Sequence, residues 1–327
     1  MKILVIGCGS IGERHIKNLQ KISAGEILAY DEYIQRAILV QERYKMKIFK
    51  DLKEALNQNP DIVFVCTPPS SHIEIALEAI NANAHVFIEK PLSHNLDKVD
   101  DLIKKANEKN LIIFVGYNFR YQKGMKLVKK YIDEGKIGKI ITARAEFGQY
   151  LPDWRPWQDY KKSYTAKKEL GGGIILDGSH ELDYIRWLIG EPENIFCIAD
   201  KLSNLEVETE DVADIILKSQ NGAICSIHMD FVRPEYSRYC EIIGEKGIIY
   251  WDYEEKIIKI YYPETKNWDI IETSDETDDM YINEIKHLIK CIKNKEKPLT
   301  DGIEGKKTLE LALAALKSAE SQKLVKL

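Results

Sequence analysis

The sequence predicts a two-domain protein of the α/β plus α+β class, with a doubly wound domain over residues 1–119 and a second domain over residues 120–327. In the first third, short apolar runs alternate with helix-like segments. These runs are continuously apolar, which is typical of a parallel sheet buried on both faces. Beyond residue 139, runs of alternating polarity separated by turn signals indicate a mostly antiparallel open sheet.

The first domain is expected to consist of βαβ units with short, right-handed connections. Asp51, Ser71 and Asn95 stand where helix N-caps are favoured. The expected strands are 2–7, 26–31, 61–68, 85–91 and 111–117, and the expected helices are 10–21, 32–45, 51–58, 71–82 and 95–109.

The second domain is expected to place helices on one face of its sheet. In the run 223–232, Cys225, Ile227, Met229 and Phe231 share the apolar face. The second face, near Tyr250, Trp251, Tyr261 and Tyr262, is expected to be covered by another subunit in a homodimer or homotetramer. The expected strands are 139–150, 212–219, 223–232, 238–244, 247–253 and 256–262, and the expected helices begin near Asp177 and span 279–294 and 302–323.

Composition excludes several classes of protein. The net charge of -5 comes without a long basic run, so we expect no nucleic-acid partner. No segment approaches the roughly 20 apolar residues of a membrane span, and the apolar start is too short for a signal peptide, so a cytoplasmic location is expected. The six cysteines form no CxxC pair and the histidines no metal-ligand cluster, so we expect free thiols and no metal.

A glycine motif follows the first strand. Gly7, Gly9 and Gly12, with Ser10 and Ile11 between them, open the first helix in a GxGxxG pattern. Small residues there let the backbone approach a pyrophosphate at the helix N-terminus. Asp31 ends the second strand, where a carboxylate binds a ribose 2′-hydroxyl and repels a 2′-phosphate. The sequence therefore predicts a Rossmann domain that binds NAD in preference to NADP.

Two charged residues end the strand-like run 85–91. In doubly wound sheets ligands bind beyond the carboxyl ends of the strands, which is where Lys90 falls. A cation there can stabilise the alkoxide that develops during hydride transfer, and Pro91 biases Lys90 toward an extended backbone. A solvated strand end with Glu89 and Lys90 in surface salt bridges is the alternative.

Three glycines precede Asp177, His180 and Asp183, which are spaced three residues apart. On one helix, this spacing places the three side chains on the same face. Histidine is the side chain most easily poised for proton transfer near neutral pH, so His180 is the expected proton acceptor and Asp177 its partner. A helix N-cap is the alternative role for Asp177. We expect Asp183 to be structural.

These motifs resemble the Gfo/Idh/MocA family of oxidoreductases. The resemblance rests, in order along nearly the whole chain, on GxGxxG, TPPSSH (67–72), EKP (89–91), GYNFR (116–120) and the glycine-rich entry to the helix with Asp177 and His180. It implies that Lys90 contacts the oxygen of the reacting carbon beside the nicotinamide. The family's aspartate more usually stands four residues before the histidine, whereas Asp177 stands three residues before His180.

The resemblance also implies further contacts. Thr67, Pro68 and His72, together with Glu89, would lie along the cofactor. Tyr117, Asn118 and Arg120 stand where cofactor or substrate could meet them, although Arg120 could instead pair with a carboxylate between the domains. The segment with Trp154, Arg155 and Tyr164 suits stacking on a sugar and pairing with a phosphate or carboxylate, or else is a packed loop.

The sequence thus predicts an NAD-dependent oxidoreductase that moves a hydride between nicotinamide and a hydroxyl or keto carbon of a sugar, sugar phosphate or nucleotide sugar. A sensor or corepressor that binds NAD without turnover is one alternative, because the fold alone does not establish catalysis. An enzyme that retains its NAD and recycles it within one catalytic cycle is another.

Overall fold

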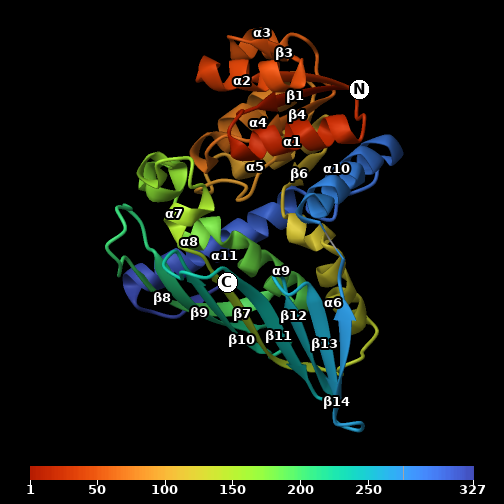
Figure 1. Cartoon of the computed structure of the whole chain (residues 1–327), viewed down its shortest axis with the longest axis vertical. Helices are drawn as coiled ribbons and strands as arrows, with labels where there is room; N and C mark the ends of the chain where they lie inside the picture. The colour runs from red at the N-terminus through yellow and green to blue at the C-terminus, as the bar shows by residue number, and fades with distance from the viewer. Residues whose placement is uncertain (275) are drawn as a thin grey trace. The chain divides into compact units, whose positions relative to one another are not determined.

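The computed structural model describes residues 1–274 and 276–327 (Figure 1). Two compact units divide the chain. Unit 1 consists of Met1–Asn118 with Thr277–Leu309, and unit 2 of Phe119–Glu276 with Glu310–Leu327. Among the described residues, no helix combines the length and apolar character needed to cross a membrane.

Unit 1 is built on a six-stranded parallel sheet in the order β3-β2-β1-β4-β5-β6. This is the strand order of the Rossmann fold, and it confirms the expected doubly wound sheet. Phe64, Phe87 and Phe114 stack across three neighbouring strands with ring centroids 4.6 and 5.4 Å apart. The strands are β1 (Lys2–Ile6), β2 (Glu26–Tyr30), β3 (Lys47–Phe49), β4 (Ile62–Val65), β5 (His85–Ile88) and β6 (Ile113–Val115).

The helices of unit 1 follow the strands as expected, with differences at their starts. Asp51 caps α3, because its side chain accepts a hydrogen bond from the Glu54 amide at 2.8 Å. Ser71 precedes α4 without capping it, since its hydroxyl donates to Thr67 instead. Asn95 does not cap α5, which begins only at Val99. The helices are α1 (Ser10–Lys21), α2 (Ile34–Tyr44), α3 (Leu52–Leu56), α4 (His72–Asn81), α5 (Val99–Glu108) and α10 (Thr277–Asn294).

Helix α10 corrects the sequence analysis. We expected it to cover the antiparallel sheet of the second domain, but it belongs to unit 1 and packs against α1. Lys17 of α1 pairs with Asp278 of α10 at 2.9 Å. Periodicity alone does not reveal this placement, because an apolar stripe on a helix does not specify which surface it covers.

Unit 2 is built on a nine-stranded sheet in the order β14-β13-β12-β11-β7-β10-β9-β8-β15. All of its pairings are antiparallel except that of β7 with β10, which confirms a mostly antiparallel sheet. Strands β8, β14 and β15 are not among those that the sequence pattern predicts. The strands are β7 (Ile140–Gly148), β8 (Pro192–Asp200), β9 (Val212–Ser219), β10 (Ile224–Asp230), β11 (Ser237–Gly244), β12 (Gly247–Asp252), β13 (Ile257–Tyr262), β14 (Asn267–Glu272) and β15 (Val325–Lys326).

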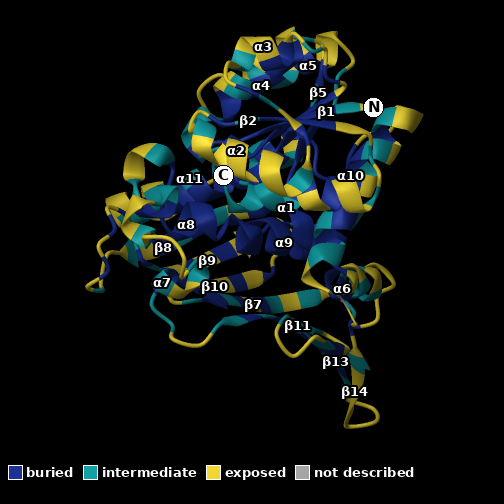
Figure 2. Cartoon of the chain, turned by 45° about the horizontal axis from the view of Figure 1, so that its top comes forward, coloured by how far each residue is buried: buried dark blue, intermediate teal, exposed yellow. Residues whose placement is uncertain are grey.

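One face of this sheet is buried by helices, and buried and exposed residues alternate along β9 and β10 (Figure 2). Helix α9 packs on β7 and α6 on β12. Residues 310–321 of α11 also belong to this unit, where the Ser318 hydroxyl accepts a hydrogen bond from the Cys197 amide. Helix α6, which the pattern does not predict, spans Lys123–Asp133; the others are α7 (Leu151–Trp154), α8 (Ile174–Asp177), α9 (Ser179–Ile189) and α11 (Gly302–Ser321).

Trp251 occupies the buried face, not the outer one where the sequence analysis expected it. The side chain is 0% exposed and meets the rings of Phe119 and Tyr184 edge-on at 5.9 Å. Its neighbour Tyr250 is half-buried on the opposite face, as the alternation of side chains along a strand requires.

We predict that Trp251→Ala lowers the free energy of unfolding by about 3–5 kcal/mol, because a large side chain is removed from a packed core. Trp268→Ala on β14 is the matched control, since Trp268 is 44% exposed. Its expected cost is about 1 kcal/mol or less. Guanidinium unfolding followed by circular dichroism measures both, and equal losses would contradict this account of the core.

Candidate active site

The glycine loop after β1 combines close packing with one open position. Gly7 has φ +93°, and a Cβ added to it would lie 2.6 Å from the Cys66 carbonyl oxygen. A Cβ on Gly12 would lie 1.8 Å from the carbonyl oxygen of Gly7. Gly9 differs, because its Cβ would meet nothing within 4 Å. The loop therefore leaves open space beside Gly9, at the N-terminus of α1.

That open space has the character of a dinucleotide site. Ser10 and Ile11 form the first turn of α1, so their amides stand among those that no helical carbonyl satisfies. Asp31 is 5% exposed, and its carboxylate accepts hydrogen bonds from the amides of Cys8 at 2.7 Å and Tyr33 at 2.8 Å. These bonds fix the carboxylate beside the loop, where its other lone pairs can accept from a ribose hydroxyl. The loop and Asp31 therefore fit NAD.

The loops after β4 and β5 are tied together by His72. Its ring is fully buried, with Nδ1 3.0 Å from the Pro91 carbonyl oxygen and Nε2 2.8 Å from that of Thr67. Burial lowers the pKa of His72, so the imidazole is neutral and donates to one of these oxygens. Both ring nitrogens thus face protein atoms. Pro68 holds the turn between β4 and α4, where its carbonyl oxygen accepts from the Ser71 amide.

Glu89 and Lys90 follow directly after β5. Glu89 is 7% exposed, and its Oε1 lies 2.6 Å from His15 Nε2. Lys90 is half-buried, and its backbone amide donates to Glu89 Oε2 at 3.2 Å. The two charges therefore have different surroundings, since the carboxylate is enclosed within unit 1 and the lysine stands at the carboxyl edge of the sheet.

The residues after β6 are all buried. Tyr117 and Asn118 belong to unit 1, and Arg120 belongs to unit 2. Arg120 is 1% exposed and donates to Asp183 with both Nε and Nη2 at 2.8 Å. This bidentate pair lies within unit 2. Arg120 therefore pairs with a carboxylate, as the alternative expected, but within unit 2 rather than between domains, and it fixes α9 through Asp183.

Asp177 and His180 do not lie on one continuous helix. Asp177 is the last residue of α8, Gly178 intervenes, and His180 lies in the first turn of α9. The expectation of a shared helix face is therefore wrong for Asp177, because Gly178 interrupts the helix, whereas His180 and Asp183 both lie on α9 as expected. Gly178, rather than Asp177, is the N-cap residue of α9. Both candidate side chains are nearly buried, at 4% and 8% exposure.

Aromatic rings and a hydroxyl hold these two candidates. The Tyr164 hydroxyl donates to Asp177 Oδ1 at 2.6 Å. The His180 ring packs edge-on against Phe119 with centroids 5.0 Å apart. Tyr164 was a candidate for stacking on a sugar, and its hydroxyl connects that segment to Asp177.

Glu210 is a candidate that the sequence analysis missed. Its Oε1 accepts from the Ile175 amide at 3.1 Å, and a Cβ on Gly173 would lie 2.4 Å from the same oxygen. Burial raises the pKa of Glu210 to about 7, with a smaller contribution from the nearby Asp177. No spacing signal along the sequence points to Glu210, since its contacts are with the Ile175 amide and the turn at Gly173.

The segment around Trp154 and Arg155, which is rich in aromatic and basic residues, is partly packed against the rest of unit 2. Trp154 donates through Nε1 to the Gln149 carbonyl oxygen at 3.1 Å and meets the Phe231 ring edge-on. Arg155 is half-buried, whereas Trp157 is 72% exposed. Trp154 and Arg155 line a small hollow together with Leu151, Gln158, Tyr160 and Ser163.

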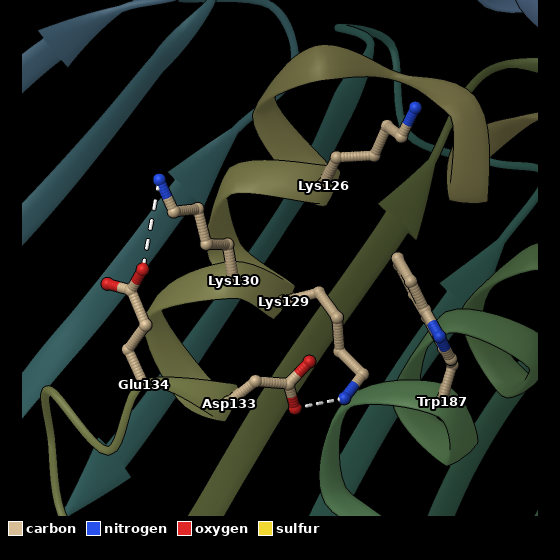
Figure 3. A pocket seen from close by; sticks show the side chains of 6 residues that line it. All are labelled: Lys126, Lys129, Lys130, Asp133, Glu134 and Trp187. Atoms are coloured by element: carbon tan, nitrogen blue, oxygen red, sulfur yellow. Dashed lines mark hydrogen bonds and ion pairs between the residues drawn. The ribbon is translucent and has the colours of Figure 1, made fainter.

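A larger hollow of about 360 Å³ opens between α6 and α9, and no candidate residue lines it. Figure 3 shows its lining, with Lys129 paired to Asp133 and Lys130 to Glu134. Trp187 forms one wall. Four of the five charged residues of the lining are thus engaged in pairs with one another, so the hollow has no strong charge of its own.

Comparison with known proteins gives concordant results for both units. Residues 1–117 match the family model described as "Oxidoreductase family, NAD-binding Rossmann fold", and residues 125–250 match that of the "GFO/IDH/MocA C-terminal domain". A myo-inositol 2-dehydrogenase from Thermotoga maritima is 32% identical, with 100% of this chain and 98% of that protein covered.

Solved structures share the fold. Levoglucosan dehydrogenase in complex with NADH and levoglucosan superimposes with a TM-score of 0.90 at 20% identity, covering 100% of this chain and 99% of that one. The WlbA dehydrogenase from Bordetella pertussis, in complex with NADH and UDP-GlcNAcA, has a TM-score of 0.85 at 24% identity, covering 100% and 98%. With both family models matched and a relative aligned end to end, the chain belongs to the Gfo/Idh/MocA family of oxidoreductases, and its first domain is an NAD-binding Rossmann domain.

Proposed function

We propose that the protein is a dehydrogenase that moves a hydride between NAD and a hydroxyl-bearing carbon of a sugar-type substrate. The observation that carries this proposal is the position of Lys90. It follows β5 at the carboxyl edge of the parallel sheet, and only β4 separates β5 from β1 and its open glycine loop. Ligands of doubly wound sheets bind beyond this edge. A cation there is suited to an oxygen that becomes negatively charged during the reaction.

The chain's own residues would divide the chemistry between charge stabilisation and proton transfer. Bound nicotinamide supplies the acceptor or donor of the hydride. The Lys90 ammonium stabilises the charge that develops on the substrate oxygen, and His180 accepts the hydroxyl proton. Asp177, held by the Tyr164 hydroxyl at 2.6 Å, orients the substrate or His180. Each role requires a side chain whose direction is fixed, as the packing around Asp177 and His180 provides.

The substrate we propose is a polyhydroxylated ring compound, either free or attached to a nucleotide. The names of the relatives support this class, since they act on myo-inositol and levoglucosan or bind UDP-GlcNAcA. The half-buried Trp154, Arg155 and Tyr164 supply aromatic faces and a guanidinium, which suit a sugar ring and an anionic group. Tyr117 and Asn118, just beyond β6, are further candidates for substrate contact.

A homodimer or homotetramer formed through the outer face of the unit 2 sheet completes the proposal. On that face Ile198 of β8 and Ile216 of β9 are 67% and 54% exposed. An apolar sheet face of this kind is stabilised when a second copy covers it.

We also propose a cytoplasmic location, which the six buried free cysteines support because free thiols persist in reducing compartments.

We predict that Lys90→Ala lowers turnover by about 100-fold or more while NADH affinity changes less than threefold, because the lost interaction acts mainly in the transition state. NADH formation is measured with a panel of myo-inositol, levoglucosan, UDP-GlcNAcA, hexoses and sugar phosphates, and NADH binding by fluorescence. Lys53→Ala, on the exposed surface of α3, is the control. Near-normal turnover of the Lys90 variant would remove this residue from the chemistry.

Asp31→Ser is expected to relax the preference for NAD over NADP, because it removes the carboxylate that would repel a 2′-phosphate. The measurement is the ratio of kcat/KM for the two cofactors, and we expect that ratio to fall by about tenfold or more, which is about 1.4 kcal/mol. Thermal unfolding without cofactor checks that the loop survives the loss of the bonds to Cys8 and Tyr33. An unchanged ratio would mean that Asp31 does not contact the ribose.

We predict, from the exposed isoleucines of the outer sheet face, that the protein sediments as an oligomer in sedimentation velocity at micromolar concentration. Ile216→Lys places a charge on this face and is expected to shift the protein toward the monomer, since burial of an unpaired charge is costly. Lys53→Ala again serves as the control. A wild-type protein that sediments as a monomer would contradict the proposal.

A further inference from the structure

Three buried ionisable side chains meet inside unit 1. His15 lies on α1, Glu89 follows β5, and Glu284 lies on α10. One nitrogen or oxygen atom of each lies within 4.8 Å of the others. His15 and Glu284 are fully buried and Glu89 is 7% exposed. This cluster connects α1, the helix that follows the glycine loop, to Glu89, the residue before Lys90.

Glu89 bridges two parts of the proposed active site. One carboxylate oxygen lies 2.6 Å from His15 Nε2, and the other accepts the backbone amide of Lys90 at 3.2 Å. The His15 ring is itself fixed, because Phe87 packs on it edge-on at 4.9 Å and Phe64 lies at 5.3 Å. Glu89 therefore connects a rigid group on α1 to the backbone of Lys90.

Glu284 lies near this pair on α10, and among the described residues neither of its own two carboxyl oxygens has a hydrogen-bond partner. An isolated buried carboxylate is costly, and a second carboxylate nearby increases the cost. Burial and the proximity of Glu89 both raise the pKa of Glu284 well above its usual value. Among the described residues, Arg14, Tyr281, Cys66 after β4 and His72 on α4 each interact electrostatically with Glu89, and Tyr281 and Cys66 also do so with Glu284.

A proton accounts for this geometry better than a metal ion. Two ligands of a tetrahedral zinc ion, each about 2.0–2.1 Å from the metal, lie about 3.3 Å apart. The separation of 2.6 Å between His15 and Glu89 is instead that of a strong, charge-assisted hydrogen bond. A proton on Glu284 also leaves a single carboxylate in the cluster, which His15 can pair.

We propose that Glu89 is a positioning residue for Lys90, held by His15 and kept as the anion of the cluster by a proton on Glu284. The inference deepens the proposed function and rests on it, since the role of Lys90 is itself proposed. Glu89 fixes the backbone of Lys90 and thereby the direction in which the ammonium leaves the sheet edge. Glu284 acts indirectly. Its neutral carboxyl group fills the space beside Glu89 and adds no second negative charge to the cluster.

Two isosteric variants separate these roles. Glu89→Gln keeps the shape but removes the anion, so we expect kcat to fall by about 10- to 100-fold through misplacement of Lys90. KM and NADH affinity are expected to stay within about twofold, because the two Glu89 oxygens contact His15 and the Lys90 amide and not the cofactor side that the resemblance implied. Glu284→Gln resembles the protonated acid and is expected to leave kcat unchanged. Both are assayed with the compound of the panel that wild-type protein oxidises fastest.

The stability of Glu284→Gln tests the proton independently of activity. The native pKa of Glu284 is raised above its unfolded value of about 4.3, so the native state binds more protons between these two values. This contribution makes wild-type stability fall as pH rises through this window, and Glu284→Gln lacks it, whereas Glu210 contributes equally to both proteins. At pH 7 we expect the variant to melt about 2–4 °C above wild type, with the difference vanishing near pH 4. Because Glu210 is also partly protonated near pH 7, the infrared test is the difference spectrum of wild type minus Glu284→Gln, in which a protonated carboxyl band is expected.

The outcomes that overturn the inference differ from those that overturn the proposed function. If Lys90→Ala is inactive while Glu89→Gln keeps normal kcat, Glu89 does not position Lys90 and the proposed function stands. If Lys90→Ala is active, the proposed function itself fails. A difference spectrum without that band, or stoichiometric zinc or manganese in wild type that Glu284→Gln lacks, would refute the proton on Glu284. Should Glu89→Gln not fold, His15→Gln removes the same ion pair and carries the same expectations.

Discussion

The carboxyl edge of the parallel sheet is the constraint on which the first domain depends. Parallel strands all end at this edge, so residues far apart in sequence arrive there together: the glycine loop after β1, Asp31 after β2, Thr67 after β4 and Lys90 after β5. The strands are buried on both faces and present few polar groups of their own. Chemistry is therefore confined to the turns, and the turns are fixed by short contacts such as that of Gly12 with the Gly7 carbonyl.

Unit 2 positions its candidates by a different device, buried ion pairs around α9. Arg120 holds Asp183 through two hydrogen bonds of 2.8 Å, and Arg238 pairs with Glu181 at 2.8 Å. The Arg238 guanidinium also lies over the rings of Phe119 and Phe147, at 4.6 and 4.0 Å. Removing one partner of such a pair leaves a buried charge, so each pair fixes the geometry of the helix more than it adds to stability. His180 lies in the first turn of α9, so the same ion pairs that hold the helix also fix the position of His180.

Features that depend on local pattern could be predicted from the sequence, and those that depend on distant contacts could not. The GxGxxG spacing and the apolar runs gave the parallel sheet, because they reflect backbone requirements within about 30 residues. Helix α10 was expected in the wrong domain because the apolar stripe of a helix does not specify which surface it packs against. The break at Gly178 and the contact of Glu210 with the Gly173 turn have no periodic signal. The partner of Glu89 could not be predicted either, since His15 lies 74 positions away.

The central claim is hydride transfer between substrate carbon and nicotinamide, and isotope transfer tests it most directly. Wild-type protein is incubated with NAD and with the panel compound that it oxidises, in its alcohol form and carrying deuterium on the reacting carbon, and the NADH formed is examined by mass spectrometry. We predict that NADH gains one deuterium and that NAD in a substrate-free control gains none. Deuterium recovered in water instead, or no NADH from any compound while NADH still binds, would contradict a dehydrogenase and favour a protein that binds the cofactor without releasing it reduced.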